Sequence, residues 1–463
     1  MNKSIIGQEI ENKSLDKLIF KYSLPAVLSG LVAALYNIVD QMFIGNIEGV
    51  LGNAATNVAF PLVTLTTAIS MLIGTGATAN FSISLGKKDM DLAKKYVSIL
   101  TTLIPIISVI VSIVVYTFAG QIIQLCGATP ENYDLALTYT KIVALGYPFS
   151  MATIAFTNII RADGSPRYSM MCTMSGAVLN CILNPVFMIG LDMGIAGAAL
   201  ATVIGQFVSF MMVVKYMLNF RTFKITKDML GVKISILKKT LSLGIAPAVN
   251  QLSMTITQIV LNNSLTYYGQ MSEYGSDIPL ACVGIISKIN MIYMTTMVGI
   301  GQGTQPIIGY SYGAEKYDKV MECYIKCVKY GSIFSVMAFI AFQVFPSQII
   351  SVFGDGNEIY YEFGVMYFKT FMFMTFLNGI QPLTGNFFTA IGKPIKGATI
   401  AFTKQILFLV PLVIILPMKM GIDGILYAGP IADILAFTMA VVFVTLQFKD
   451  LKRLEVLNEG VNK

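Results

Sequence analysis

The chain has 463 residues, of which 55% are hydrophobic and only 12% are charged, and its mean hydropathy is +0.70. So apolar a composition excludes an ordinary soluble globular protein and predicts a polytopic membrane protein. The formal net charge of +7 does not indicate a nucleic-acid partner, because the basic residues fall in alternating loops between apolar segments, where they set membrane orientation.

Twelve transmembrane helices are predicted, because apolar windows of roughly 19 residues, the length that crosses a bilayer, recur between charge and turn clusters. No cleavable signal pattern precedes the first window, so we expect it to be a retained helix. The expected spans cover residues 18–45, 54–85, 96–120, 135–160, 168–190, 194–216, 238–268, 279–311, 320–346, 359–388, 397–417 and 421–447.

Lysine and arginine are distributed unevenly between the loops. Outside the spans, nearly all of them lie in the terminal segments and the even-numbered loops, whereas Lys419 alone lies in an odd-numbered loop. By the positive-inside rule this distribution predicts that both termini are cytoplasmic. The cytoplasmic set includes Lys13, Lys17, Lys21, Lys87, Lys88, Lys94, Lys95, Arg161, Arg167, Lys215, Arg221, Lys316, Lys319, Lys326, Lys329, Lys393, Lys396, Lys449, Lys452 and Arg453.

The two halves of the chain repeat one another around a central polar segment. Gly164 and Pro166 recur as Gly392 and Pro394, and Gly194 recurs as Gly421, at an offset of 227 or 228. We therefore predict an N-terminal six-helix bundle (1–216), a cytoplasmic linker (217–237) and a C-terminal six-helix bundle with a short cytoplasmic tail (238–463). Because each repeat holds an even number of helices, the expected fold is all-α, with 12 transmembrane helices in two bundles related by a pseudo-two-fold axis along the membrane normal.

A carboxylate, Asp40, lies inside the first span. A charged group at membrane depth is costly unless it faces a polar cavity, so Asp40 is a candidate functional residue. The alternative is an aspartate near enough to the helix end to reach water. Asn180, Asn184 and Thr202 lie at a similar depth in the fifth and sixth spans, and would converge with Asp40 if these helices meet. Each of these polar side chains could instead simply bond a neighbouring helix.

The second half carries a different set of charges within its spans. Lys288, Lys369 and Lys404 are accompanied by only one acid well inside, Asp433. Lys369, Lys404 and Asp433 fall at comparable depths, so we expect a structural ion pair among them. A substrate-binding or coupling role for Asp433 is the second possibility.

The cysteines, the glycine-rich strings and the potential nucleophiles argue against a metal site, a phosphate-binding loop and an enzyme. The six cysteines are scattered, and without histidine a zinc site would need further thiolates that are not nearby, so we expect no metal site. The strings GTGAT and GIGQGTQP lie within apolar helices, which favours close helix packing or a hinge over a phosphate-binding loop. No nucleophile and base assemble into a catalytic set, so an enzyme is not expected.

Several strings together resemble a known family. The aspartate in YNIVDQMFIG, the string LNCILNP, the paired loops RADGSPRY and IGKPIKGA, and the run GIGQGTQPIIGYSYGA are similar to those of the MATE (multidrug and toxic compound extrusion) transporters of the MOP flippase superfamily. The similarity covers essentially the whole chain. It is strongest to the bacterial multidrug-efflux branch.

The resemblance implies a monomeric antiporter of the bacterial inner membrane that exports small cationic amphipathic compounds in exchange for protons or sodium, with no other cofactor. It implies that Asp40 is the coupling carboxylate, that Asn180, Asn184 and Thr202 surround it, and that Pro25 bends the first helix when the protonation state changes. Many relatives have aspartate in place of Asn184, and the glutamate of the sodium-coupled branch is missing from QIVLNNSL. These two departures favour protons over sodium.

Three other functions compete with drug export on the residues alone. A lipid or polysaccharide-precursor flippase of the same superfamily would need basic groups in the central cavity, and would be favoured if Lys288, Lys369 and Lys404 all face it. A membrane-embedded enzyme lacks a catalytic set. A channel would need a continuous polar stripe on several helices, and the polar residues here are too few and too local.

Overall fold

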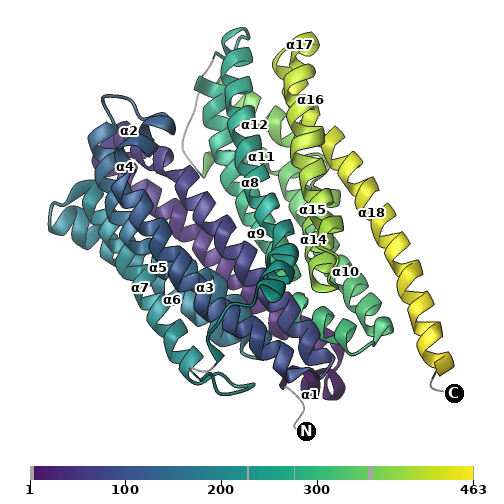
Figure 1. The fold of residues 1–463 in the computed structure, drawn as a ribbon. Coiled ribbons are helices and arrows are strands. Elements are labelled where there is room, and N and C mark those ends of the chain that lie inside the picture. Colours follow the sequence, from purple (N-terminus) through teal and green to yellow (C-terminus); the bar gives the residue numbers. More distant parts are fainter. Residues whose placement is uncertain (1–4, 227–228, 276, 353–357, 462–463) are drawn as a thin grey trace.

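The computed structural model describes residues 5–226, 229–275, 277–352 and 358–461, which fold as helices joined by short connections (Figure 1). Residues 227 and 228 of the predicted linker lie outside this described part. The first half contains α1 (Ile5–Asn12), α2 (Leu15–Gly86), α3 (Met90–Thr117), α4 (Ala119–Leu125), α5 (Tyr133–Ala162), α6 (Pro166–Pro185), the π-helical turn η1 (Val186–Gly190) and α7 (Gly194–Leu218).

The second half begins with the helix α8 and ends with α18, which is its longest helix. Its elements are α8 (Ile234–Gln270), α9 (Asp277–Gly313), α10 (Tyr317–Val344), α11 (Pro346–Ser351), α12 (Glu358–Thr370), α13 (Thr375–Asn378), α14 (Ile380–Ala390), α15 (Pro394–Phe402), the π-helical η3 (Thr403–Leu409), α16 (Val410–Ile415), α17 (Pro417–Met420) and α18 (Ile422–Val461).

Ten helical segments of the described chain are long and apolar enough to cross a membrane, and they match ten of the twelve predicted spans. The predicted seventh span is α8, a continuous helix of 37 residues whose apolar character is diluted by several asparagines and glutamines. The predicted tenth span is divided into α12, α13 and α14. The chain is therefore an all-helical, multi-pass membrane protein.

The predicted loop between the first two spans is not a loop. Both spans belong to α2, and the only non-helical residue inside it is Gly49, with φ 65° and ψ −154°. Glycine adopts a positive φ without the steric penalty of a Cβ atom. One glycine therefore turns the chain where the sequence predicted a connection of several residues.

In the divided tenth span, side chains of neighbouring helices donate hydrogen bonds to backbone carbonyls near the breaks. The Tyr293 hydroxyl donates to the Thr375 carbonyl at 2.8 Å, and the Gln343 amide donates to the Phe368 carbonyl at 3.3 Å. A helix can be interrupted at membrane depth only where neighbouring groups satisfy the carbonyls that it frees. The break is thus a stable feature of the second bundle.

The predicted internal repeat is visible in the backbone. Left-handed residues recur at matching places: Gly164 with Gly392 (φ 86° and 76°), and Lys88 with Glu315 (both φ 59°). In each half the turn at this glycine is followed by a proline in the first turn of the next helix, α6 or α15. Proline suits that position because its missing N–H would be unpaired there in any case.

The two halves share a hydrophobic core at one end only. One cluster of buried side chains contains residues of α1, α2 and α3 from the first half and residues of α9, α10 and α14 from the second half. This cluster therefore belongs to both halves. Towards the other end the first half has its own cluster, and the second half has another. In Figure 1 the bundles meet near the N-terminus and diverge away from it. The molecule is closed at the end that holds α1.

Glycines allow the halves to approach closely at this end. A Cβ atom on Gly76 would lie 1.9 Å from the Thr240 carbonyl oxygen, and one on Gly303 would lie 2.4 Å from the Ser23 Cα atom. The Gly-rich strings of the sequence therefore serve as packing surfaces between α2, α8 and α9. No side chain larger than hydrogen fits at these points.

The tightest of these contacts gives a first prediction. A Cβ atom on Gly244 would lie 1.6 Å from the Leu72 carbonyl oxygen, so Gly244→Ala must push α8 away from α2. We expect a loss of about 1–3 kcal/mol in stability, the usual cost of overpacking, measured as a lower thermal midpoint. Gly284→Ala is the control, because a Cβ atom there meets nothing within 4 Å. An equal midpoint for both variants would contradict the packing role.

Helix α1 bridges the two halves at the closed end. Ile6 and Ile10 are buried in the shared core. Glu9 accepts hydrogen bonds from Lys21 and Tyr22 of the first half, and Lys319 of α10 donates to the Ile10 carbonyl at 3.2 Å. Two further ion pairs cross between the halves here, Glu11 with Lys316 at 3.6 Å and Asp16 with Lys326 at 2.7 Å.

Glu9 is the most buried acid of this helix. Burial acts to raise the pKa of its carboxyl, but hydrogen bonds from Lys13 and Lys21 outweigh burial and lower the pKa below its ordinary value. The bonds of Glu9 therefore stabilise the closed end at neutral pH. That stabilisation is lost only as the pH falls through the lowered pKa.

Candidate functional site

The four polar residues predicted to converge in the first half form one hydrogen-bonded chain. The Asn184 amide donates to Asp40 Oδ1 at 2.6 Å and to Asn180 Oδ1 at 3.2 Å, and the Asn180 amide donates to Thr202 Oγ1 at 3.0 Å. The four residues come from α2, α6 and α7, and all are buried. The structure thus brings together the groups that the sequence placed at a common depth.

Asp40 has no positively charged partner. Its side chain is only 7% exposed, and no lysine or arginine of the described residues lies within ion-pair distance. Tyr36 and Tyr139 lie close enough to interact electrostatically with it, and neither carries a charge to balance it. A buried carboxylate without a counter-charge is costly. It is therefore suited to take up a proton or another cation.

One atom of the Asn184 side-chain amide makes no hydrogen bond in the described part of the chain. Its Nδ2 atom faces Asp40, whereas its Oδ1 atom is buried and has no hydrogen-bond partner among the described residues. The amide orientation matches an ionised Asp40, which accepts hydrogen bonds only. A protonated Asp40 would instead donate, and a rotated amide could accept through Oδ1. Asn184 can therefore serve both protonation states.

Glu48 is a positioning residue that the sequence analysis missed. Its Oε1 atom accepts a hydrogen bond at 2.8 Å from the backbone N–H of Ile195, in the first turn of α7. The free N–H groups of a helix N-terminus attract carboxylates, so Glu48 fixes the start of the helix that carries Thr202. The signal available in the sequence was an acid close to Gly49, one turn from the end of the first span.

Pro25 lies inside α2, about 22 Å along the helix from Asp40 at 1.5 Å per residue. The helix continues through it, and the Ser29 hydroxyl donates to the Pro25 carbonyl at 2.8 Å. Proline cannot donate to the carbonyl of Lys21, which leaves one backbone bond of the helix unmade. The predicted role in bending remains a prediction, and the weakened turn is where a bend would be cheapest.

The second half contains a buried ion pair between Lys404 and Asp433. Their side chains are 2.9 Å apart and only 5% and 8% exposed. Lys404 lies on the π-helical η3 and also donates a hydrogen bond to Asn378, at the end of the short helix α13. The charge of Asp433 is therefore already balanced, in contrast to that of Asp40.

The other two predicted lysines do not join this pair. Lys369 is exposed at the end of α12, and it has no ion-pair partner in the described part of the chain. The structural ion pair expected among Lys369, Lys404 and Asp433 is therefore formed by Lys404 and Asp433, and Lys369, which precedes the helix break after Thr370, takes no part in it. Lys288 is half-buried on α9.

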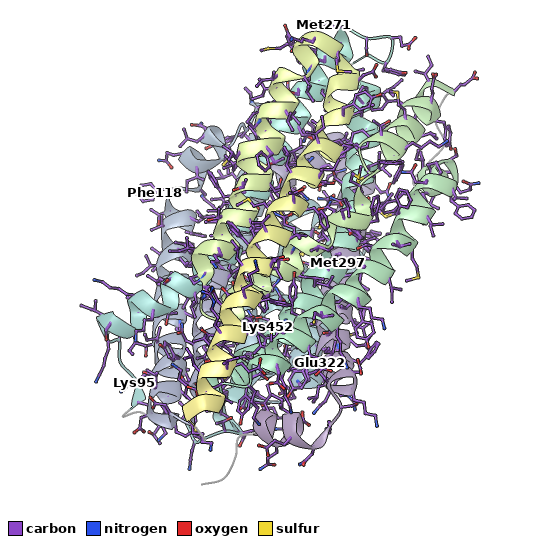
Figure 2. All side chains as sticks on the ribbon, turned by 90° about the vertical axis from the view of Figure 1, so that its right-hand side faces the viewer. Lys95, Phe118, Met271, Met297, Glu322 and Lys452 are labelled. Carbon is purple, nitrogen blue, oxygen red and sulfur yellow. The ribbon has the colours of Figure 1, made fainter. Side chains whose placement is uncertain are left out.

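The three charged side chains labelled in Figure 2 lie at the closed end of the molecule. Lys95, Glu322 and Lys452 lie towards the end that holds α1, whereas Phe118 and Met271 lie towards the other (Figure 2). Every hydrogen bond and ion pair found between the two halves of the described chain lies at the α1 end, among them Ser23 with the Ile300 carbonyl. The carboxylate of Asp40 lies beyond these contacts, towards the end where the bundles diverge.

Comparison with known proteins agrees with these features. The MatE family model matches residues 25–186 and 249–415, which is more than half of the chain. The chain belongs to the MatE family. The resemblance to MATE transporters noted in the sequence is thereby confirmed.

The relatives of this MatE chain include export proteins of staphylococci. The multidrug export protein MepA of Staphylococcus aureus (strain MSSA476) is 28% identical over 447 residues, covering 94% of this chain and 95% of its own length. MepA of Staphylococcus haemolyticus (strain JCSC1435) is 25% identical over 445 residues, covering 94% of each chain. Both relatives are named as exporters.

Solved structures show the same fold. A MOP superfamily transporter from Pyrococcus furiosus superposes with a TM-score of 0.89 at 21% identity, covering 97% of this chain and 100% of the other. A multidrug resistance MATE family transporter in an outward-facing conformation gives the same values. The two-bundle architecture predicted from the repeat is thus the fold of MATE transporters.

The family match divides the candidate residues of this MatE chain. Pro25, Asp40, Asn180 and Asn184 lie within its first block, and Lys404 lies within its second. Thr202 and Asp433 lie outside both blocks. The assignment of these two residues therefore depends on their hydrogen bonds and ion pair alone.

Proposed function

We propose that this protein is a proton-coupled antiporter that exports small cationic amphipathic compounds by alternating access between its two bundles. The observation that carries the proposal is the buried carboxylate of Asp40, which is hydrogen-bonded by Asn184 and has no cationic partner among the residues that the structure describes. The names of the staphylococcal relatives support the export of drugs. The remaining details rest on the physical chemistry of the site.

An uncompensated carboxylate provides a simple means of exchange. Its charge is stabilised by a proton or by a cationic substrate, and a single carboxylate cannot be neutralised by both at once. Entry of a proton from one side would therefore release a cation bound there, and the departure of the proton on the other side would allow the next cation to bind. Competition at Asp40 couples the two movements.

Protons fit this site better than sodium. A sodium site needs several oxygen ligands, whereas the nearest Asn184 atom to Asp40 is the amide nitrogen. Only one carboxylate is present in the chain Asp40, Asn184, Asn180 and Thr202. The unpartnered Asn184 Oδ1 atom can accept a hydrogen bond from protonated Asp40 after rotation of the amide. Sodium coupling remains the competing assignment.

Alternating access requires the closed end to open. Following the lysine distribution, we place α1 and both termini on the cytoplasmic side of a bacterial inner membrane, with the protein acting as a monomer. In this orientation the structure is closed to the cytoplasm, and the bundles diverge towards the outside. Inward opening must break the contacts of α1 with both halves, together with the Asp16–Lys326 ion pair.

The buried ion pair argues against a flippase of anionic lipid precursors. That function would be favoured if three lysines of the second half faced the central cavity. Lys404, however, forms a buried ion pair with Asp433 and donates a hydrogen bond to Asn378. Lys369 is exposed at the far side of a helix break. Of the three lysines, Lys404 is therefore not free to bind such a substrate, which leaves Lys288 and Lys369 as the basic groups of the second half.

Dye efflux from proteoliposomes tests the proposal. We expect a fluorescent cationic dye to be expelled when a proton gradient is imposed, and not when a sodium gradient alone is imposed. Asp40→Asn removes the exchangeable charge and should reduce gradient-driven efflux by about 100-fold, the factor expected when an essential proton-transfer group is lost.

Asp423→Asn is the matched control, because it makes the same chemical change at an exposed acid on the first turn of α18. It should leave efflux unchanged. Absence of gradient-driven efflux in the unaltered protein would refute drug export. Full activity of Asp40→Asn would refute coupling through this carboxylate, and sodium-driven efflux would reassign the ion.

A further inference from the structure

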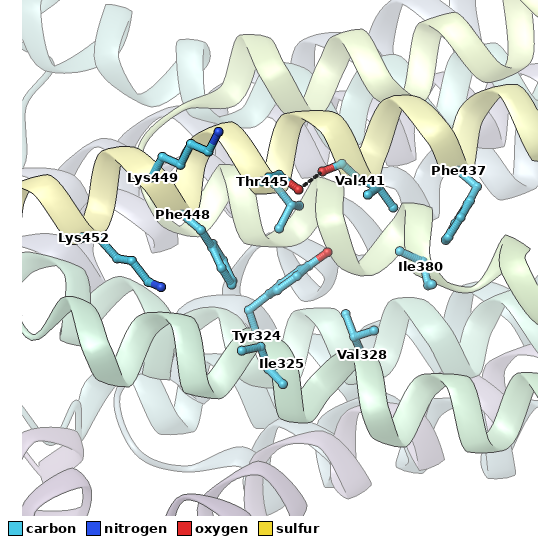
Figure 3. A pocket seen from close by; sticks show the side chains of 11 residues that line it. Tyr324, Ile325, Val328, Ile380, Phe437, Val441, Thr445, Phe448, Lys449 and Lys452 are labelled. Atoms are coloured by element: carbon cyan, nitrogen blue, oxygen red, sulfur yellow. Dashed lines mark hydrogen bonds between the residues drawn. The ribbon is translucent and has the colours of Figure 1, made fainter.

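A groove of about 550 Å³ opens on the second bundle between α10 and α18, with α14 behind it (Figure 3). It lies away from Asp40, which is in the first half. Most of its wall is hydrocarbon and aromatic. The lining residues are Tyr324, Ile325, Val328, Ile380, Phe437, Val441, Val444, Thr445, Phe448, Lys449 and Lys452.

The two hydroxyl groups of the wall are already hydrogen-bonded within the protein. The Tyr324 hydroxyl is hydrogen-bonded to Thr384 at 2.8 Å, and the Thr445 hydroxyl donates to the Val441 carbonyl at 2.8 Å. The rings of Tyr324 and Phe448 pack edge to face, with centroids 5.8 Å apart. The groove therefore offers a preformed, apolar surface, which suits a hydrocarbon chain and gives little to a polar ligand.

Two lysines of α18, Lys449 and Lys452, line one end of the groove, and their side chains extend to opposite sides of α18 in the view of Figure 3. Lys449 and Lys452 are exposed, lie one helical turn apart on α18, and make no ion pair within the described chain. Asp450 and Glu322 are paired elsewhere, since Asp450 pairs with Lys393 at 3.6 Å and Glu322 pairs with Lys326 at 3.0 Å. Glu455, three residues after Lys452 on α18, makes no ion pair with it in the described chain. Two positive charges are thus left unbalanced beside an apolar groove.

We propose that this groove binds an anionic phospholipid, with its phosphate at Lys449 and Lys452 and an acyl chain extending towards Phe437. Basic groups at the membrane surface next to an interhelical groove are the chemistry that recognises anionic lipid headgroups. A cationic drug would be repelled by the lysines, and a free phosphate ion would leave the apolar part empty. The site is independent of the transport function proposed above, and requires only that the chain spans a bilayer.

Because the chain contains no tryptophan, a single introduced tryptophan can report on this groove alone. Phe437→Trp places the reporter at the acyl end, and the full-length variant is reconstituted in vesicles that contain brominated phosphatidylglycerol or brominated phosphatidylcholine. Bromine on the acyl chains quenches a tryptophan that they touch. We expect phosphatidylglycerol to compete for the site about 10- to 30-fold better, the factor that two lysines at a membrane surface supply.

Lys449→Ala with Lys452→Ala should remove this preference while leaving quenching by both lipids detectable. Lys238→Ala with Lys239→Ala makes the same change in net charge at exposed residues of α8 and should keep the preference. A reporter at Phe207→Trp, an exposed position on α7, should show no preference. Equal quenching of Phe437→Trp by the two lipids would overturn the proposal, as would a preference that survives loss of Lys449 and Lys452 or disappears with Lys238 and Lys239.

Discussion

Replacing Lys404 by alanine should destabilise the protein by about 3–5 kcal/mol, the cost of leaving one member of a buried ion pair without its partner. Asp433 would be left without its cationic partner at a site where its side chain is only 8% exposed, and either an uncompensated charge or an added proton there is costly. Asn378 would also lose a hydrogen bond, at the point where the tenth span is broken. Thermal unfolding of the purified protein measures the loss as a lower midpoint.

The double variant Lys404→Met with Asp433→Leu separates the charge effect from packing. Buried ion pairs replaced by apolar side chains of similar size are often neutral or more stable, so this variant should recover most of the lost stability. Lys369→Ala, at an exposed lysine, should change stability by less than about 0.5 kcal/mol. If Lys404→Ala behaves like Lys369→Ala, the ion pair does not stabilise the second bundle.

Replacing Asn184 by aspartate should convert the coupling site into one that uses sodium. The Asn184 amide lies 2.6 Å from Asp40, so a second carboxylate there would face the first directly. Two such charges about 4 Å apart repel by about 4 kcal/mol at an effective dielectric of 20. A cation held between two carboxylates relieves this repulsion. We expect sodium-driven dye efflux to rise at least about 10-fold, which corresponds to about 1.4 kcal/mol of relief.

Asn37→Asp provides the control for added charge on the same helix. Asn37 is exposed on α2, and its amide donates to the Ala33 carbonyl and not to Asp40. This variant should leave the response to sodium unchanged. A silent Asn184→Asp variant, or an equal gain in Asn37→Asp, would show that ion choice is not set by the number of carboxylates beside Asp40.

Much of the fold was predictable because hydropathy and glycine–proline turns act locally. Ten of the twelve predicted spans reappear as apolar helices. The repeated turns follow from Gly164 and Gly392, which adopt a positive φ, each with a proline two residues later. One exception is the turn between the first two spans, where the single residue Gly49 takes the place of a loop. The other is the break in the tenth span, where the Tyr293 hydroxyl hydrogen-bonds the Thr375 carbonyl that the break leaves free. Such features depend on neighbours that a hydropathy window does not contain.

The candidate site was predictable in part for a different reason. Depth along a helix follows from counting residues, so Asp40, Asn180, Asn184 and Thr202 could be placed at one level before their contacts were known. Which charges pair across helices depends on packing, so the sequence could not exclude Lys369 from the Lys404 site. Nor could it show that α1 spans the two halves, although Ile6 and Ile10, one turn apart, were a sign of a helix with one apolar face.

The ion pairs that close the two halves near α1 are sensitive to ionic strength. The Glu11–Lys316 and Asp16–Lys326 pairs that close the two halves have side chains between 26% and 45% exposed, and such pairs weaken as the Debye length shrinks from about 8 Å in 0.15 M salt to about 3 Å in 1 M salt. Salt in the compartment that bathes α1 should therefore favour opening at that end, whatever the salt cation is. A sodium gradient made by adding salt to one side would change this equilibrium without any sodium site, so the two sides need equal ionic strength before a coupling ion can be named.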